Sequence, residues 1–341
     1  MASGSELELS AWLAALPKVE LHLHLEGAIP LPALWELLCK YGGDPRAADL
    51  SALERRFVYR DFSDFIETWF WKNGFLREYD DFTFIAESVA RDLATQRVRY
   101  AEVFFSPPDF AYYGLKTARL AEAIRRGLER VPEVQVALIA DLVRDYGPQR
   151  AARTLAEVRE TGAAGVVGVG LGGSEQAYPP EPFAAVFEDA RRAGLHTTAH
   201  AGEDAGPASI WGALRALQVE RVGHGTRAAE DPALLRHLAE RRLPLEMCPI
   251  SNVRTGVVAS VAAHPIRAFH EAGLQVTVST DDPKMFGTSL EAEYAALVTE
   301  LGFGRAEVCE LIARAAAASW LPEERRHALV AELRADPAWI A

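Results

Sequence analysis

The stretch Pro182–His200, which reads PFAAVFEDARRAGLHTTAH, contains one complete helix-to-strand unit of the fold. A helical pattern begins at Pro182, where the missing N–H of proline is tolerated, and continues to Arg192. Gly194 follows at the position expected for a helix C-cap, and Leu195–His200 then predicts a strand. The same Ala-Gly-Leu sequence recurs at 272–274, ahead of another predicted strand.

This alternation of helix and strand continues through the chain. The predicted strands are Val19–His24, Val98–Phe105, Val134–Leu142, Gly165–Leu171, Leu195–His200, Arg221–His224, Pro244–Cys248 and Leu274–Thr280. Helical periodicity lies between most of them, at Leu31–Tyr41, Thr117–Arg130, Pro148–Glu160, Pro182–Arg192, Ala208–Leu217, Pro232–Arg241 and Ala263–Ala272. Eight βα units in one chain predict an α/β fold, the (β/α)8 TIM barrel. A doubly wound open sheet is the structural alternative, although it would leave the polar residues described below without a common mouth.

The chain is longer than a typical barrel, and the excess lies in two places. Its 341 residues exceed the roughly 250 of this fold, yet no Ser/Gly-rich linker divides them, so we expect a single domain over residues 1–341. An aromatic helical insertion follows the first strand at about 57–96, and residues 288–341 form extra C-terminal helices. Aromatic residues recur at positions 62, 65 and 69 with roughly helical spacing. This spacing fits a helix packed on the barrel, a lid over a substrate, or both.

Composition and charge restrict the partners. Hydrophobic residues make up 49% and charged residues 25% of the chain, as in globular proteins. Lys and Arg minus Asp and Glu gives 36 − 48 = −12, which disfavours nucleic acid and anionic membrane surfaces as partners. No segment approaches the roughly 20 apolar residues of a membrane helix, and no secretory signal is evident. The three cysteines stand far apart, so we expect a cytoplasmic protein without a disulfide framework. No feature of the composition indicates an oligomeric state.

Histidines mark the end of the first predicted strand. His22 and His24 are two residues apart, so their side chains share one face of the strand. Two imidazoles that face the interior of a barrel are unfavourable unless a partner satisfies them, and a divalent metal would do so. The alternative is a pair of histidines that are hydrogen-bonded within a polar mouth.

Further imidazoles and carboxylates end other strands, and in a barrel these ends share one face. His200 and His224 close the fifth and sixth predicted strands, and Asp281 and Asp282 follow the eighth. The set of His22, His24, His200 and Asp281 offers ligands suited to Zn²⁺, with a position left for water. Glu203 lies on the loop that follows His200, where it can act as general acid or base. His224 can be a metal ligand or can orient hydroxide. No lysine ends the fourth strand, so a second metal of the carboxylated-lysine type is not expected.

Four motifs together resemble the adenosine/adenine deaminase family. They are PKVELHLHLEG at 17–27, HAGE at 200–203, GHG at 223–225 and STDDP at 279–283, and they occur in the family's order. The resemblance runs from about Pro17 to the C-terminus and implies a (β/α)8 barrel with one zinc ion per chain. It implies metal binding by His22, His24, His200 and Asp281, and catalytic roles for Glu203, His224 and Asp281.

The same resemblance implies a small-molecule purine as the binding partner. The substrate-binding residues that it implies are His24, Glu26, Gly173 and Asp282. Glu203 would protonate the purine N1, and His224 would steady the attacking hydroxide. Asp282 would hydrogen-bond N7, and the Gly173 N–H would reach N3. The implied reaction is zinc-dependent hydrolytic deamination of a 6-aminopurine nucleoside, either adenosine or a 5′-modified adenosine, to the inosine-type product and ammonia.

Two positions depart from the pattern of adenosine-specific members. Position 26 is Glu, where those members usually carry Asp to meet the ribose 5′-hydroxyl. The segment GVGLGGSE at 168–175 is similar to that of adenine deaminases, yet Gly172 stands where those enzymes usually have an acidic residue. Adenine deaminase and aminodeoxyfutalosine deaminase are therefore alternatives. A metallo-barrel hydrolase of amides or esters is the alternative from another class, because a fold does not fix a function.

Overall fold

Eight parallel strands form a barrel. The computed structural model describes residues 4–59 and 62–340. Its strands are β1 (Lys18–His24), β2 (Val98–Phe105), β3 (Gln135–Asp141), β4 (Val166–Gly170), β5 (His196–Ala201), β6 (Arg221–His224), β7 (Pro244–Met247) and β8 (Gln275–Val278). Each strand pairs with the next in the chain. A parallel bridge between Asp281 and Leu23 links the end of β8 to β1, and Asp281 N–H donates to His22 O. The predicted barrel is thus confirmed, and the open sheet is wrong.

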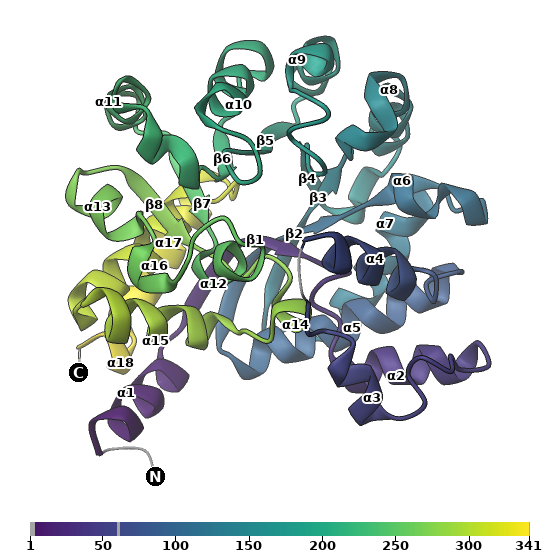
Figure 1. Ribbon diagram of the computed structural model, residues 1–341, viewed down its shortest axis with the longest axis horizontal. Coiled ribbons are helices and arrows are strands. Elements are labelled where there is room, and N and C mark those ends of the chain that lie inside the picture. The colour runs from purple at the N-terminus through teal and green to yellow at the C-terminus, as the bar shows by residue number, and fades with distance from the viewer. Residues whose placement is uncertain (1–3, 60–61, 341) are drawn as a thin grey trace.

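A ring of helices surrounds the strands (Figure 1). The helices that follow β1 to β8 in this ring are α5 (Tyr79–Thr95), α7 (Thr117–Leu128), α8 (Gly147–Val158), α9 (Ala184–Arg192), α10 (Pro207–Gly212), α11 (Pro232–Arg241), α13 (Ile266–Glu271) and α16 (Arg305–Ala318). The remaining helices are α1 (Gly4–Ala15), α2 (Leu31–Lys40), α3 (Leu50–Arg55), α4 (Phe62–Asn73), α6 (Pro107–Phe110), α12 (Pro249–Arg254), α14 (Pro283–Phe286), α15 (Leu290–Leu301), α17 (Glu323–Ala335) and α18 (Pro337–Ile340).

The strand β1 is buried on both faces, as expected for a strand between helices and a filled barrel interior. Leu21 and Leu23 join the apolar core. Glu20 lies on the face that it shares with His22 and His24, and its carboxylate accepts hydrogen bonds from the backbone N–H and hydroxyl of Thr280. Alternation along one strand therefore separates packing residues from polar ones.

The predicted insertion at 57–96 has two parts with different positions. Helix α5 belongs to the ring, and Thr83 in it donates to Ala123 O of α7 across the helix contact. A Cβ at Gly127 of α7 would lie 2.2 Å from Thr83 O, so only glycine permits this approach. Helix α4 instead lies over the carboxyl end of β1, where Lys72 Nζ donates to Glu26 O at 2.8 Å.

The role expected for the aromatic residue at position 62 lies outside what the structure describes, because the side chains of 60–63 are not described. The C-terminal helices also divide, since α16 completes the ring beside β8 and β1, while α15 packs against α1. Within the described ranges, no helix is both long enough and apolar enough to cross a lipid bilayer.

Candidate active site

Four potential ligand atoms converge at the carboxyl end of the barrel. His22 and His24 come from β1, His200 from β5, and Asp281 follows β8. The Nε2 atom of His200 lies 3.0 Å from Nε2 of His22 and 3.1 Å from Nε2 of His24. Asp281 Oδ1 lies 3.5 Å and 3.3 Å from the same two atoms. Ligand atoms of a tetrahedral zinc ion with bonds of about 2.0–2.1 Å stand roughly 3.3 Å apart, so this spacing fits such a metal.

The electrostatics of this cluster also fit a cation. Burial lowers the pKa of His24 to about 3 and that of His200 well below its usual value, so both rings are neutral and can offer lone pairs. Burial would do the same to His22, but the carboxylates of Asp281 and Glu246 raise its pKa to about 10. The environment of the cluster therefore stabilises a positive charge. A divalent metal bound by the same ligand atoms would supply that charge.

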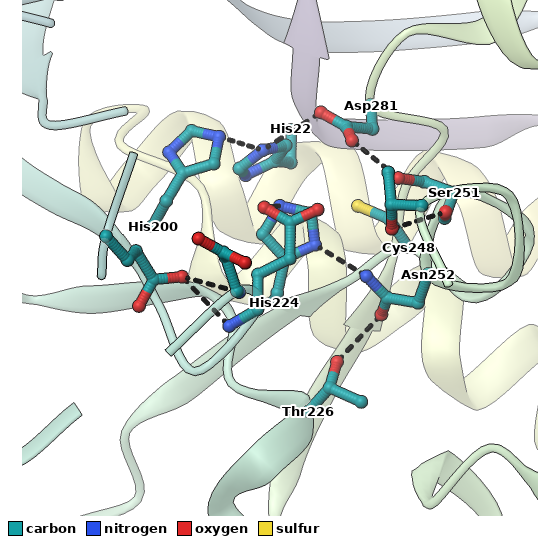
Figure 2. Close-up of polar contacts among 12 residues, drawn as sticks. His22, His200, His224, Thr226, Cys248, Ser251, Asn252 and Asp281 are labelled. Atoms are coloured by element: carbon teal, nitrogen blue, oxygen red, sulfur yellow. Dashed lines mark hydrogen bonds and ion pairs between the residues drawn. The ribbon is translucent and has the colours of Figure 1, made fainter. Parts of the chain in front are cut away.

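Buried residues behind the cluster orient its ligands. His22 Nδ1 lies 2.9 Å from Glu246 Oε2, so Nδ1–H donates to the carboxylate and Nε2 faces the cluster. Glu246 in turn pairs with the buried guanidinium of Arg221. On the other side, Ser251 Oγ donates to Asp281 Oδ2 at 2.7 Å, as Figure 2 shows. These contacts fix the rotamers of two ligands before any metal binds.

Glu203 and His224 lie beside the cluster. His224 offers a ring nitrogen within 4.8 Å of the ligand atoms of His22, His200 and Asp281. Its Nε2 is 3.4 Å from Glu203 Oε2. Burial, together with the charges of Asp281 and Glu175, raises the pKa of Glu203 well above its usual range. This shift favours the protonated form of Glu203, from which it can donate a proton to a bound molecule.

Sequence reasoning missed Glu175, which holds the loop that carries Glu203. Its carboxylate accepts hydrogen bonds from the consecutive backbone N–H groups of residues 202–204, at 2.8–3.1 Å, and from Ser209 Oγ at 2.6 Å. The side chain is buried in the structure, whereas the sequence showed only an acidic residue shortly after a predicted strand. Its partners lie 27–34 residues away, which the local pattern does not show.

The predicted substrate-binding residues divide into two groups. Asp282 lines the cavity, and its Oδ1 is buried without a hydrogen-bond partner among the described residues. Gly173 also lines it, with φ +98°, and a Cβ there would lie 2.0 Å from Asp145 Oδ2. Glu26, in contrast, is not among the lining residues. Its Oε1 accepts the N–H of Ser106, and Ser106 faces the cavity.

The cavity in front of the cluster has a volume of about 220 Å³. One wall is formed by side chains of α4, namely Phe65, Ile66, Trp69 and Phe70. Acidic residues that follow other strands also line the cavity, namely Asp109, Asp141 and Asp145. No lysine or arginine is among the described residues that line it. The cavity thus combines an aromatic wall with hydrogen-bond acceptors and offers no cationic side chain to an anionic group.

These observations define a (β/α)8 barrel with a buried histidine–aspartate cluster that fits a metal ion, and the comparisons with known proteins specify it further. The chain belongs to the adenosine deaminase family, whose model matches residues 17–336. The resemblance seen in the four sequence motifs is therefore confirmed. The protein is a metal-dependent hydrolase of C–N bonds that deaminates an adenine-type substrate.

Individual relatives cover nearly the whole chain. An aminodeoxyfutalosine deaminase of Streptomyces coelicolor is 37% identical over 340 residues, which cover 98% of this chain and 88% of the relative. An adenine deaminase of the same organism is 37% identical over 333 residues, covering 95% and 96%. The crystal structure of an amidohydrolase from Burkholderia ambifaria with bound zinc is 27% identical, has a TM-score of 0.89, and covers 100% of this chain and 94% of that one.

Proposed function

We propose that this protein is a zinc-dependent deaminase of a 6-aminopurine nucleoside with a large 5′ group that lacks phosphate, of the aminodeoxyfutalosine type. The proposal has two levels, the reaction and the substrate. The reaction rests on one observation, namely that Glu203 lines the same cavity as His24, His200 and Asp281 of the cluster, with His224 Nε2 3.4 Å from Glu203 Oε2. The bound zinc of the Burkholderia structure supports the choice of metal.

Each residue has a defined task in the proposed reaction. Zinc bound to the cluster would lower the pKa of a water molecule to about 7, which makes that water nucleophilic at neutral pH. Glu203 would donate its proton to N1 of the purine as the water, having lost one proton, adds to C6 as hydroxide. The hydroxyl proton of the adduct would then pass to the C6 amino group, which leaves as ammonia, and the proton lost by the water restores Glu203. His224 orients the attacking oxygen. The carboxyl of Asp282 donates to N7, and the Gly173 N–H donates to N3.

The reaction is tested with the zinc-loaded protein and Glu203→Gln. We expect loss of the 6-aminopurine absorbance with stoichiometric release of ammonia, and a fall of kcat by about 10²–10⁴-fold in the variant. Zinc content should stay at one per chain in both. The matched control is Glu188→Gln, which changes a largely exposed carboxylate on α9 and should leave kcat unchanged. Full activity of Glu203→Gln would refute the assigned acid. Amide or ester hydrolysis without purine turnover would favour the alternative, a metallo-barrel hydrolase of amides or esters.

The substrate follows from the walls of the cavity. A phosphate would find no lysine or arginine among the described lining residues, so a nucleotide is disfavoured. The aromatic wall, with Ile66 and Phe70, instead suits a 5′ extension that carries an aromatic ring. The aminodeoxyfutalosine deaminase among the relatives supports this choice by its name.

Comparison of kcat/KM for aminodeoxyfutalosine, adenosine, adenine and AMP tests the substrate. We expect aminodeoxyfutalosine to be at least about tenfold better than the others, since one extra apolar contact contributes about 1–3 kcal/mol. Phe70→Ala should reduce this preference, whereas Tyr112→Ala, on an exposed tyrosine that does not line the cavity, should not. Equal activity on adenosine would refute the extended substrate but not the reaction.

Free adenine is a second candidate because of Asp141. Its Oδ1 accepts the N–H of Gly172, and its Oδ2 lies 2.6 Å from where a Cβ of residue 172 would be. A carboxylate from β3 thus occupies the place of the acidic side chain missing at position 172. If Gly173 N–H contacts N3, Asp141 lies beside N9, which carries a hydrogen only in the free base. Adenine as the best substrate, with activity lost in Asp141→Asn, would select this candidate.

A further inference from the structure

We propose that His264 and Asn252 are positioning residues that place the ring proton of His224 on Nε2, which makes His224 a hydrogen-bond donor to the attacking oxygen and excludes it as a metal ligand. The sequence left both roles of His224 open. The inference rests on the proposed function, because the donor acts on the oxygen that attacks the purine. The polarity of a chain of hydrogen bonds, which starts at a backbone N–H that can only donate, fixes the position of this proton.

The chain of hydrogen bonds starts at Ile266. Its backbone N–H donates to His264 Nδ1 at 3.2 Å, and a backbone N–H has no other role. His264 Nδ1 is therefore the acceptor of the ring. Burial lowers the pKa of His264 to about 3, so the ring is neutral and carries its single proton on Nε2.

Asn252 accepts the hydrogen bond from His264 Nε2–H, which fixes the orientation of its side-chain amide. His264 Nε2 lies 3.1 Å from one polar atom of the Asn252 side chain, which must be the oxygen because Nε2 donates. Thr226 Oγ1 donates to the same oxygen at 2.7 Å. The amide nitrogen then lies on the other side of the group, 3.1 Å from His224 Nδ1. Figure 2 shows Asn252 between Thr226 and His224.

The polarity of His224 follows from this order. An amide nitrogen only donates, so His224 Nδ1 accepts and the proton of the neutral ring is on Nε2. This nitrogen is buried, faces Glu203 Oε2 at 3.4 Å, and has no close hydrogen-bond partner among the described residues. An N–H group has no lone pair for a metal. His224 can therefore only donate toward the space in front of the cluster, where the attacking oxygen must lie.

The direct test is ¹⁵N NMR of the zinc-loaded protein labelled at histidine, which distinguishes protonated from unprotonated ring nitrogens. The signals of His224 are assigned by their loss in His224→Gln. We expect the proton on Nε2 in both His224 and His264. A proton on Nδ1 of His224, or an unprotonated Nε2, overturns the proposal whatever the substrate is. Failure of the proposed function would appear separately, as absent purine turnover with the expected ring protonation.

The variant Asn252→Asp reverses the polarity at almost constant shape. Both carboxylate oxygens accept, so His264 and Thr226 keep an acceptor, but the atom facing His224 Nδ1 no longer donates. We expect the proton on His224 Nδ1 and a fall of kcat by about 10²–10⁴-fold with KM within about threefold, the size of effect of a misplaced catalytic tautomer.

Thr226→Val is the matched control. It removes one hydrogen bond to the same Asn252 oxygen but leaves His264 to fix the orientation of the amide. We expect the wild-type tautomer and kcat within about threefold of wild type. Unchanged ring protonation in Asn252→Asp would overturn the proposal. An equal loss of kcat in Thr226→Val would do so too, because Asn252 would then act by packing alone.

Discussion

Replacement of Glu175 by glutamine tests how the loop that carries Glu203 is held. The carboxylate accepts four hydrogen bonds, two on each oxygen. A glutamine keeps one oxygen, and its best orientation leaves that oxygen with the N–H groups of Glu203 and Asp204. Its NH₂ group then faces the N–H of Gly202, while the hydroxyl of Ser209 can turn to accept.

The expected cost follows from this geometry. A hydrogen bond to a charged group contributes about 1.5–3 kcal/mol, and a buried N–H left unpaired costs about 1–3 kcal/mol. These two contributions describe overlapping losses, so we expect the free energy of unfolding to fall by about 3 kcal/mol. We also expect kcat to fall by about 100-fold, because a displacement of about 1 Å in a catalytic group costs about that factor.

Urea unfolding and purine turnover measure the two effects on zinc-loaded protein. Ser209→Ala is the graded control, since it removes one of the four hydrogen bonds and leaves the three backbone contacts intact. It should lower the free energy of unfolding by about 1.5 kcal/mol and change kcat less than about threefold. If Glu175→Gln kept both wild-type stability and wild-type kcat, other contacts would have to position Glu203, and the role assigned to Glu175 would be wrong.

Three further predictions concern other parts of the site. Gly173→Ala places a methyl group 2.0 Å from Asp145 Oδ2 at φ +98°, so kcat/KM should fall about 100-fold, and a value within threefold would contradict the predicted N3 contact. Arg221→Met removes the cation between Glu102 and Glu246, and urea unfolding should show a loss of about 3–5 kcal/mol together with weaker zinc binding. Removal of the metal by a chelator should abolish turnover and lower the unfolding midpoint, and zinc should restore both; turnover without metal would refute the metal-dependent reaction.

The sequence contained enough to locate the metal site, because the relevant residues end strands. His22, His24 and His200 stand at strand ends, and the barrel brings every such end to one face. The same logic placed Asp281 and Glu203 near them. Periodicity and strand position thus predicted which side chains meet, although they did not predict the distances between them.

The residues that orient this site were not predictable in the same way. Glu175, Asn252 and His264 act through hydrogen bonds to distant backbone or side-chain atoms, and no local pattern marks such contacts. Asp141 illustrates a second reason. Its carboxylate fills the space beside Gly172, so an acidic group absent from one strand is supplied by its neighbour. Only the packed structure relates the two positions.

The strained backbone at Asp281 explains why two consecutive carboxylates can serve one cavity. Side chains alternate along a strand, so Asp281 and Asp282 would point to opposite faces if β8 simply continued. Asp281 instead has φ 63°, a left-handed conformation that is unfavourable for a residue other than glycine. The turn lets Asp281 reach the histidines while Asp282 packs over Gly27, where a Cβ would lie 1.7 Å from Oδ1. His224 ends β6 with the similar value of 59°, so at both positions strained backbone aims a functional side chain into the mouth of the barrel.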